Sequence, residues 1–239
     1  MIEATDVHKT FRRGEREVEV LRGISCRIPK GQCAFVVGPS GSGKSTLLYL
    51  LGALDRPTRG AIRVGGQDLS TMTEAERDAY RRDRVGFIFQ SFNLMQNLTA
   101  LENVLIPFRM RRVPKAARRA AIELLAEVGL EERMNHRPYQ MSGGEQQRVA
   151  IARALIKDPS VILADEPAGE LDSRNGDEIY RILRRLQSAR RTTLVVVTHD
   201  RRPIVPDDRI LEIQDGRLAG SGVNPNITNP HLGHLLVRS

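Results

Sequence analysis

Apolar residues along the chain gather into short continuous runs, which predict buried strands of a parallel sheet. The runs are Cys33–Val37, Val85–Phe89, Val161–Ala164 and Thr193–Val197. A strand that is covered on both faces needs apolar side chains at successive positions, whereas a half-exposed strand alternates. The first 30 residues or so do alternate and contain turn residues, so a small antiparallel sheet is expected at the N-terminus.

The middle of the chain has a helical pattern instead. Pro114 suits a first helical position, and Gly129 supplies a C-terminal stop. Between them an apolar stripe is expected from Ile122, Leu124, Leu125 and Val128.

These patterns predict an α/β fold in one domain. We expect a core with a mainly parallel sheet, an N-terminal antiparallel β subdomain and an inserted α-helical subdomain. The expected bounds are 1–90 and 151–218 for the core, 91–150 for the helical part and 219–239 for a tail. The tail is interpreted as a short docking helix or a disordered end.

Charge and aromatic content bear on the kind of partner that the chain binds. The net charge is +8, but acidic and basic residues are interleaved along most of the chain. The exception is a basic run at Arg109, Arg111, Arg112, Lys115, Arg118 and Arg119. Aromatic residues make up only 4% of the chain, so an anionic membrane surface or an acidic partner suits this run at least as well as nucleic acid.

Two further observations concern the compartment. Cys26 and Cys33 lack C-x-x-C spacing and His or Cys companions, so they are interpreted as apolar fillers in a reducing compartment. There is no signal-peptide pattern and no apolar stretch near 18 residues. We therefore expect a chain that neither spans a membrane nor is exported.

The segment that follows the first apolar run fits the phosphate-binding pattern G-x-x-x-x-G-K-[ST]. Its residues are Gly38, Pro39, Ser40, Gly41, Ser42, Gly43, Lys44, Ser45 and Thr46. Glycines let backbone N–H groups curl around a polyphosphate, the lysine reaches the β and γ phosphates, and Ser45 can ligate Mg²⁺. A helix-compatible run, Thr46–Leu51, completes the strand–loop–helix context. The pattern predicts nucleotide binding.

Polar side chains close three of the predicted strands. Asp165 and Glu166 follow the third strand, where Asp165 is expected to hold Mg²⁺ and Glu166 to act as general base for water. His199 follows the fourth strand and is expected to contact a γ-phosphate. Gln90 closes the second strand and is expected to ligand the metal or its water. A charged strand end and a structural histidine are the plainer alternatives.

A second candidate phosphate site lies about a hundred residues after the first. Ser142 and Glu145 form a capping box before an amphipathic run, so a well-capped helix is the plainer interpretation. Gly143 and Gly144 in the first turn are unfavourable for a helix, which indicates close approach of another group to the backbone. The helix start is therefore a candidate contact for phosphate.

In their order along the chain these motifs resemble those of the ATP-binding cassette (ABC) ATPases, over residues 1 to about 218. The resemblance implies a head-to-tail dimer that holds two ATP molecules between the phosphate loop of one subunit and the signature helix of the other. Ser142, Gly144 and Gln146 would then act across the interface, and Asp172 would lie where the two sites meet. Phe11 occupies the place of an adenine-stacking aromatic, with a core position in the N-terminal sheet as the alternative.

Within this family the chain looks like the lipoprotein-release and macrolide-efflux branch. The matching segments are 18–25, 52–60, 89–94 and 98–104. This implies a polytopic membrane partner and a place on the inner face of the cell membrane. Ala168 and Glu170 depart from the Thr and Asn usual in the branch, and Pro203 and Pro206 would break a helix expected after His199.

Three functions follow from the resemblance. The first is an ATPase subunit of an export or lipoprotein-release complex, docked near Ser91–Val104. The apolar residues Phe92, Leu94, Met95 and Leu98 suggest this docking surface, with packing inside the helical insert as the alternative. The second is a soluble ABC ATPase acting on DNA or ribosomes, which usually has a long coiled-coil insertion or two cassettes. The third is a cell-division regulator that uses the same dimer.

Overall fold

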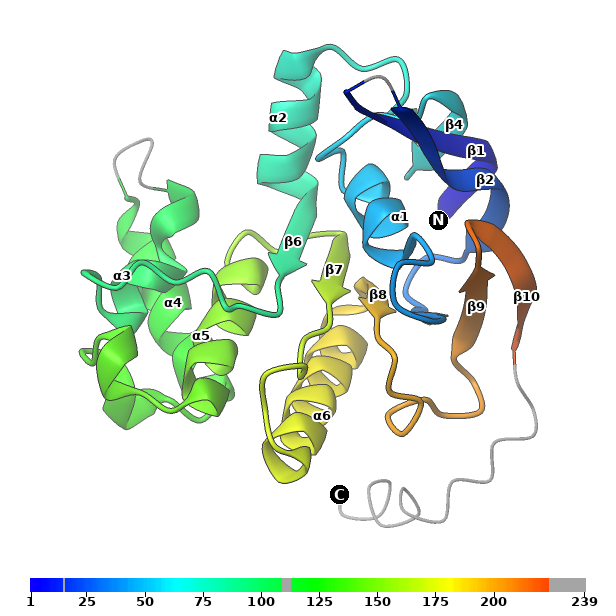
Figure 1. Cartoon of the computed structure of the whole chain (residues 1–239). Coiled ribbons are helices and arrows are strands. Elements are labelled where there is room, and N and C mark those ends of the chain that lie inside the picture. Colours follow the sequence, from blue (N-terminus) through cyan, green and yellow to red (C-terminus); the bar gives the residue numbers. More distant parts are fainter. Residues whose placement is uncertain (15, 109–112, 224–239) are drawn as a thin grey trace.

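A six-stranded sheet forms the centre of the protein (Figure 1). The computed structural model describes residues 1–14, 16–108 and 113–223. Five neighbouring strands of this sheet run parallel, and the sixth, at one edge, runs antiparallel. In spatial order the strands are β10 (Arg217–Val223), β9 (Arg209–Gln214), β3 (Cys33–Val37), β8 (Thr193–Val197), β7 (Val161–Asp165) and β6 (Val85–Ile88).

The predicted continuous apolar strands are confirmed. Every residue of β3, β7 and β8 is buried, because helices or a second sheet cover both faces of the central sheet. On one face Phe35 and Val196 pack against α5 (Gly143–Leu155) and α6 (Ser173–Arg190). On the other face Val36 and Leu163 pack with α1 (Lys44–Leu51) and the N-terminal sheet.

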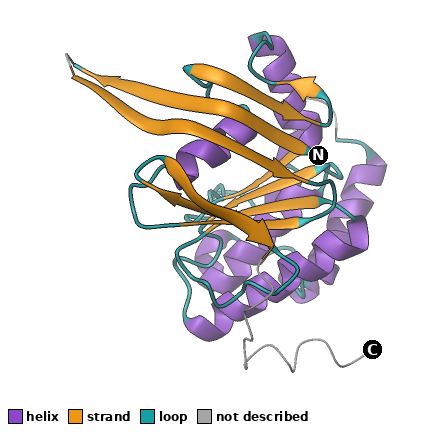
Figure 2. Cartoon of the chain, turned by 90° about the vertical axis from the view of Figure 1, so that its right-hand side faces the viewer, coloured by secondary structure: helices purple, strands orange, loops and turns teal. Residues whose placement is uncertain are grey.

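The N-terminal antiparallel sheet is also confirmed, and it is larger than predicted. Its order is β2 (Arg16–Ile28), β1 (Ile2–Arg13), β4 (Arg59–Val64) and β5 (Gln67–Asp68). Figure 2 shows the long β1–β2 hairpin beside the central sheet. Helix α2 (Glu74–Arg84), which begins at a Thr73 capping box, leads directly into β6. The loop after β3 lies against both sheets, because Gly38 is close to Ile213 of β9 and Gly43 is close to Leu21 of β2.

The inserted helical subdomain forms a separate lobe, green in Figure 1. It contains α3 (Ala100–Val104), α4 (Lys115–Glu127), most of α5 and three short 3₁₀ turns at Ile106–Phe108, Glu131–Arg133 and Pro138–Gln140. The expected boundary at residue 150 falls inside α5, which runs on to Leu155 and so joins the lobe to the core sheet.

Two details of α4 differ from the prediction. Pro114 is the N-cap and not the first helical residue, with an extended backbone before the helix. Ile122 is 38% exposed, because Ala117 and Ala121 form the buried face together with Leu124 and Leu125. Gly129 does supply the stop, with a φ of 73°.

The end of the described chain also differs from the expectation. Strand β10 continues to Val223, so the segment expected as a tail from Ala219 starts within a strand. The rest of the expected tail and Arg109, Arg111 and Arg112 of the basic run lie outside the described residues. After His199 the chain reaches β9 through turns that contain Pro203 and Pro206. In the part of the chain that the structure describes, each helix is too short or too polar to cross a lipid bilayer.

Candidate nucleotide site

Strand register brings the sequence motifs to one edge of the central sheet. Val36 of β3 and Asp165 of β7 both pair with Val197 of β8, two residues before His199. Ile88 of β6 pairs with Ala164 of β7, two residues before Gln90 and Glu166 respectively. The phosphate loop and the polar residues after β6, β7 and β8 therefore share the carboxyl edge, where α/β sheets bind ligands.

The phosphate loop needs glycine at its two ends. Gly38 has a φ of 149°, and a Cβ there would lie 2.0 Å from the carbonyl oxygen of Ile213. Gly43 has a φ of 102°, and a Cβ there would lie 2.7 Å from Cδ2 of Leu21. A Cβ on Gly41, in the middle, would have no heavy atom within 4 Å. The loop is thus fixed at both ends and open over its centre.

Two polar side chains of the loop fit a polyphosphate. Lys44 is only 8% exposed, and its Nζ donates to the carbonyl oxygen of Pro39 at 2.8 Å, within the loop itself. The buried Oγ of Ser42 has no hydrogen-bond partner in the structure. Gly43 caps α1 without a side-chain acceptor, so the first backbone N–H groups of the helix can meet an anion. A buried cation, an unpaired hydroxyl and a helix start together suit a phosphate chain.

The expected metal ligands Ser45 and Asp165 are in direct contact. Oγ of Ser45 donates to Oδ1 of Asp165 at 2.9 Å. Burial at the end of β7 raises the pKa of Asp165 above its ordinary value. A hydroxyl and a carboxylate at this spacing are hard oxygen ligands of the kind that Mg²⁺ takes. These two residues could therefore hold the ion together.

Sequence reasoning missed Tyr49 at this position. Its hydroxyl hydrogen-bonds Asp165, and its pKa is raised by burial and by the Asp165 charge. The only available signal was its spacing four residues after Ser45, which puts both side chains on one face of α1. Tyr49 gives Asp165 a second hydrogen-bond partner.

Glu166 and His199 form the second contact of the site. The backbone of Glu166 is left-handed, with a φ of 45°, and its N–H donates to the carbonyl oxygen of Val197 at 2.9 Å. Its Oε1 lies 3.0 Å from Nδ1 of His199 and accepts the backbone N–H of His199 at 3.2 Å. The Glu166 side chain is 19% exposed and that of His199 74%. A shallow hollow of about 140 Å³ adjoins both residues and reaches Asp172 at the start of α6.

Gln90 lies on the loop after β6, beyond the strand end, which is at Ile88 and not at Phe89. Its amide packs against Gly169, where a Cβ would come within 3.2 Å of Nε2. Oγ of the next residue, Ser91, donates to Oε1 of Glu170 at 3.2 Å. In this structure Gln90 contacts the loop after Glu166, and Glu170, a departure from the family pattern, helps to join the two loops.

The start of α5 has the predicted capping box. Oγ of Ser142 accepts from the N–H of Glu145 at 3.3 Å, and Oε2 of Glu145 accepts from the N–H of Ser142 at 2.7 Å. Gly143 and Gly144 are the first two helical residues and not interior ones, so the helix-interior penalty does not apply fully. A Cβ on Gly143 would meet Leu171 at 3.1 Å and one on Gly144 would meet Asn175 at 3.3 Å. Close packing within the chain therefore already calls for small residues there.

The remaining expected site residues, Gln146, Asp172 and Phe11, make contacts with residues outside the phosphate loop. Nε2 of Gln146 donates to the carbonyl oxygen of Met141 at 3.1 Å. Asp172 caps α6, and hydrogen bonds from Asn175 lower its pKa. Phe11 is 41% exposed on β1, with Nζ of Lys9 4.8 Å from its ring centroid, so the alternative of a core position is wrong.

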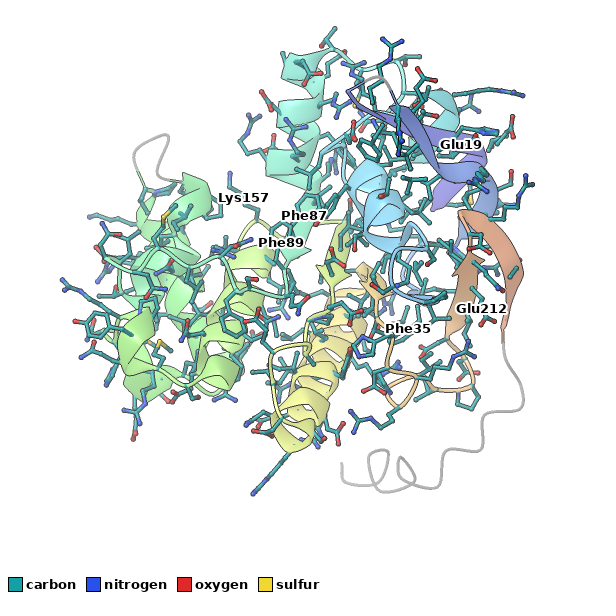
Figure 3. The ribbon with its side chains drawn as sticks, in the orientation of Figure 1. Glu19, Phe35, Phe87, Phe89, Lys157 and Glu212 are labelled. Atoms are coloured by element: carbon teal, nitrogen blue, oxygen red, sulfur yellow. The ribbon has the colours of Figure 1, made fainter. Side chains whose placement is uncertain are left out.

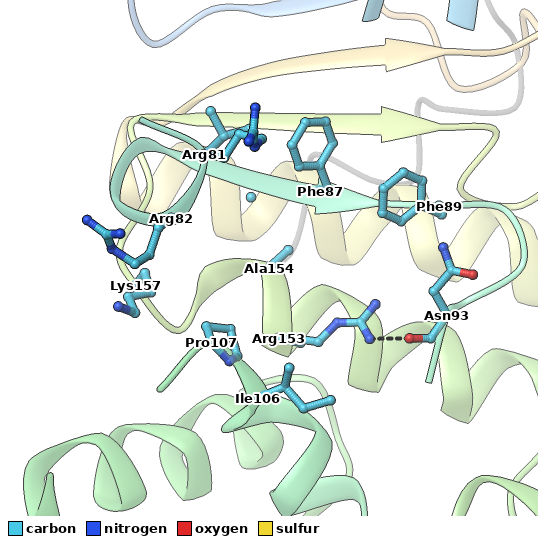
Figure 4. Close-up of a pocket in the computed structure, with 12 residues that line it drawn as sticks. Arg81, Arg82, Phe87, Phe89, Asn93, Ile106, Pro107, Arg153, Ala154 and Lys157 are labelled. Atoms are coloured by element: carbon cyan, nitrogen blue, oxygen red, sulfur yellow. Dashed lines mark hydrogen bonds between the residues drawn. The ribbon is translucent and has the colours of Figure 1, made fainter. Parts of the chain in front are cut away.

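A groove runs between the helical lobe and the core (Figure 4). Its volume is about 340 Å³, and its lining includes Ile106, Pro107 and Phe89 together with four basic residues, Arg81, Arg82, Arg153 and Lys157. Arg153 donates to the carbonyl oxygens of Phe92, at 2.8 Å, and Asn93. Figure 3 labels Lys157, Phe87 and Phe89, which all line the groove, in the region where the lobe meets the core.

Of the apolar residues expected on a docking surface, Met95 is 54% exposed and Leu94 packs against the helical core. Phe92 and Leu98 are half-buried. Leu94 therefore packs inside the helical insert, whereas Met95 is exposed, as a docking surface requires.

Comparison with known proteins agrees with this geometry. The ABC transporter family profile matches residues 21–169. The lipoprotein-releasing system ATP-binding protein LolD of Syntrophotalea carbinolica is 48% identical over 92% of this chain and 97% of its own length. The macrolide export ATP-binding/permease protein MacB of Burkholderia pseudomallei strain 1710b is 46% identical over 95% of this chain but only 35% of its own length.

A solved structure shares the fold closely. It is the dimeric ATP-binding cassette MJ0796 in a post-hydrolysis state with ADP and Pi, which has a TM-score of 0.84 and 40% identity. The match covers 93% of this chain and 98% of that one. The predicted fold class, a P-loop ATPase core with a β subdomain and a helical subdomain, is thereby confirmed. With its phosphate loop, signature helix start and carboxyl-edge residues in this arrangement, the chain belongs to the ABC transporter family.

Proposed function

We propose that this chain is the ATP-hydrolysing subunit of a membrane complex for export, lipoprotein release or mechanical signalling. The observation that carries the proposal is the convergence of the phosphate loop, the Ser45–Asp165 pair and the Glu166–His199 pair at one sheet edge. A nucleotide bound there would have its phosphates between a buried lysine and a carboxylate that can accept a proton.

Each residue has a distinct role in this proposal. Lys44 leaves the Pro39 carbonyl and binds the β and γ phosphates, while the open backbone at Gly41 follows the phosphate chain. Ser45 and Asp165 would hold Mg²⁺, which stabilises charge on the phosphate oxygens when bound. Glu166 orients the attacking water and takes its proton, and His199 keeps the Glu166 carboxylate in place and faces the γ-phosphate. Gln90, on the adjoining loop, would change its contacts when a nucleotide occupies the site.

The second half of each site is proposed to come from another copy of the chain. The start of α5 offers Ser142, Gly143, Gly144 and Gln146. Helix α5 lies in the helical lobe, to one side of α1 and the loop before it (Figure 1). A head-to-tail homodimer would bring them to the partner's nucleotide, with Asp172 between the two sites and Phe11 against adenine. The dimeric state of the MJ0796 cassette supports this arrangement.

The membrane partner is proposed to insert a short helix into the groove that Asn93 lines and to contact Met95, two residues further along the chain. The groove has apolar walls at Ile106, Pro107 and Phe89, and its basic rim favours acidic residues on the partner. Lys115, Arg118 and Arg119 are exposed on α4 and suit an anionic lipid surface nearby. The names of the LolD and MacB relatives, a lipoprotein-releasing system protein and an ATP-binding/permease protein, support a membrane complex. The chain is proposed to lie on the inner face of the membrane. We do not expect a nucleic-acid partner.

The test uses the purified chain and cell membranes. We expect Mg²⁺-dependent release of phosphate from ATP, a dimer that light scattering detects with ATP and not with ADP, and recovery of an integral membrane protein with the tagged chain. Absence of ATP hydrolysis with or without the membrane fraction would overturn the proposal. Strong salt-sensitive binding to DNA or ribosomes, without a membrane partner, would favour the soluble ATPase instead.

A further inference from the structure

One buried polar side chain in the described structure connects three segments of the site and has no role in the mechanism above. Gln147, on α5, is fully buried. Its Nε2 donates to the carbonyl oxygen of Pro167 at 2.6 Å and to that of Phe89 at 3.3 Å. Its Oε1 is buried without a hydrogen-bond partner. Burying an amide whose oxygen has no hydrogen-bond partner costs free energy of folding. The burial of Gln147 therefore calls for an explanation, and the two hydrogen bonds of its nitrogen offer one.

Each carbonyl belongs to the residue next to a proposed active residue. Phe89 directly precedes Gln90, and Pro167 directly follows Glu166. Gln147 itself lies five residues after Ser142 on one continuous helix, which is a rise of about 7.5 Å. One amide group therefore ties the helix start to the Gln90 loop and to the Glu166 loop.

The surrounding packing makes this tie specific. Gly143 and Gly144 approach Leu171 and Asn175, so the first turn of α5 already rests on the loop and helix after Glu166. The rings of Phe87 and Phe89 are stacked, with centroids 5.6 Å apart, at the boundary between the lobe and the core sheet (Figure 3). Gln147 crosses this same boundary by hydrogen bonds, which, unlike apolar packing, fix direction as well as distance.

We infer that Gln147 is a positioning residue that couples the two half-sites of one chain. It fixes the helix start, which serves the partner's nucleotide, relative to Gln90 and Glu166, which serve the chain's own nucleotide. The bond to Pro167 joins α5 to the Glu166 loop, and the bond to Phe89 joins it to the Gln90 loop. This inference rests on the proposed ATPase function and its dimer.

Gln187 provides a matched control. Its Nε2 also donates to two backbone carbonyls, those of Gly31 at 2.7 Å and Thr192 at 3.0 Å. It lies near the C-terminal end of α6, where the chain enters β3 and β8, at the edge of the sheet opposite the site. Replacing either glutamine by methionine removes a donor from two carbonyls at nearly constant side-chain length.

The experiment compares Gln147→Met and Gln187→Met with the parental chain. Both variants should melt at a lower temperature and bind ATP within about twofold of the parent at the phosphate loop. Only Gln147→Met should lower kcat at saturating ATP, by about 10- to 100-fold, because misplacing catalytic groups has that effect. In a Glu166→Gln background, only Gln147→Met should weaken the ATP-dependent dimer.

Several outcomes would overturn the inference. One is a Gln147→Met variant with parental kcat, and another is an equal loss of kcat in both variants. If Gln147→Met does not fold, Gln147→Glu is measured instead. Its kcat relative to the parent should rise as the pH falls, because a protonated carboxyl regains one donor, and a flat ratio would contradict the inference. If the parental chain itself lacks ATPase activity, the proposed function fails and not the coupling.

Discussion

Nδ1 of His199 lies 3.0 Å from Oε1 of Glu166, and the same oxygen accepts the backbone N–H of His199. The two residues follow neighbouring parallel strands, so the register of β7 and β8 alone brings them together. His199 thus fixes the orientation of the Glu166 carboxylate within a single chain. No second copy of the chain is needed for this contact. The proposed base and its proposed orienting group therefore form a preassembled unit.

The first prediction follows from that contact. Glu166→Gln keeps the shape of the side chain and an oxygen that can face His199, but it removes the proton acceptor. Hydrolysis should fall by about 10²- to 10⁴-fold, the usual contribution of a general base. ATP binding should remain, and light scattering should detect a stable ATP-bound dimer. A variant that turns over near the parental rate would exclude Glu166 as the base.

The second prediction separates binding from catalysis. Lys44→Ala removes the buried cation of the phosphate loop, so ATP affinity should fall by about 10- to 100-fold, as expected for lost hydrogen bonds to charged groups. His199→Ala should leave affinity within about twofold and lower kcat by about 10²-fold or more, comparable to loss of one transition-state contact. Titration calorimetry and phosphate release measure the two quantities.

A result in which His199→Ala binds ATP as poorly as Lys44→Ala would assign the histidine to ground-state binding. His199 is largely exposed, and its bonds within the chain are to Glu166, so loss of the ring should not disturb the phosphate loop. The melting temperatures of both variants serve as the control for folding.

The third prediction tests action across the dimer. Ser142→Arg places a bulky cation at the start of α5 but leaves the phosphate loop of the same subunit intact. Neither Ser142→Arg nor Lys44→Ala subunits alone should hydrolyse ATP. Mixed in equal amounts, they can form heterodimers with one intact composite site, and part of the activity should return if sites act independently. Failure of ATP to induce any heterodimer, measured with two different tags, would contradict the head-to-tail arrangement.

The sequence predicted those parts of the site that depend on local pattern. The phosphate loop and the carboxylates at the end of β7 are contiguous motifs beside continuous apolar runs. The strands that carry them, and the edge of the sheet on which they lie, could therefore be predicted from these runs. The capping box at Ser142 was likewise a local signal and is confirmed.

The rest depends on contacts between distant segments. The partners of Gln147 lie 58 and 20 residues away, so no spacing in the sequence reveals its role. The spacing of Tyr49 from Ser45 places the two side chains on one face of α1, but Asp165 lies 120 residues from Ser45, so that spacing does not show which carboxylate they meet. The expected position of Ile122 in the apolar stripe is wrong because Ala117 and Ala121, within α4, let the helix bury a different face. From sequence, the glycines at the start of α5 indicate close approach of another group to the backbone, and within the chain the groups that approach them are Leu171 and Asn175.

The last prediction concerns the membrane partner. Met95 is 54% exposed and follows Asn93, which lines the groove, by two residues. The ring of Phe92 would lie 3.5 Å from a Cβ on Gly143 and so supports the start of α5. Met95→Asp is therefore the cleaner change, and it should abolish stimulation of ATP hydrolysis by the membrane partner because it puts a carboxylate against an acidic or apolar helix. The isolated chain should keep its basal rate within about twofold. Ile122→Asp, an exposed apolar position on α4, is the control and should retain stimulation. Equal stimulation of parent and Met95→Asp in reconstituted membranes would place the partner elsewhere on the molecule.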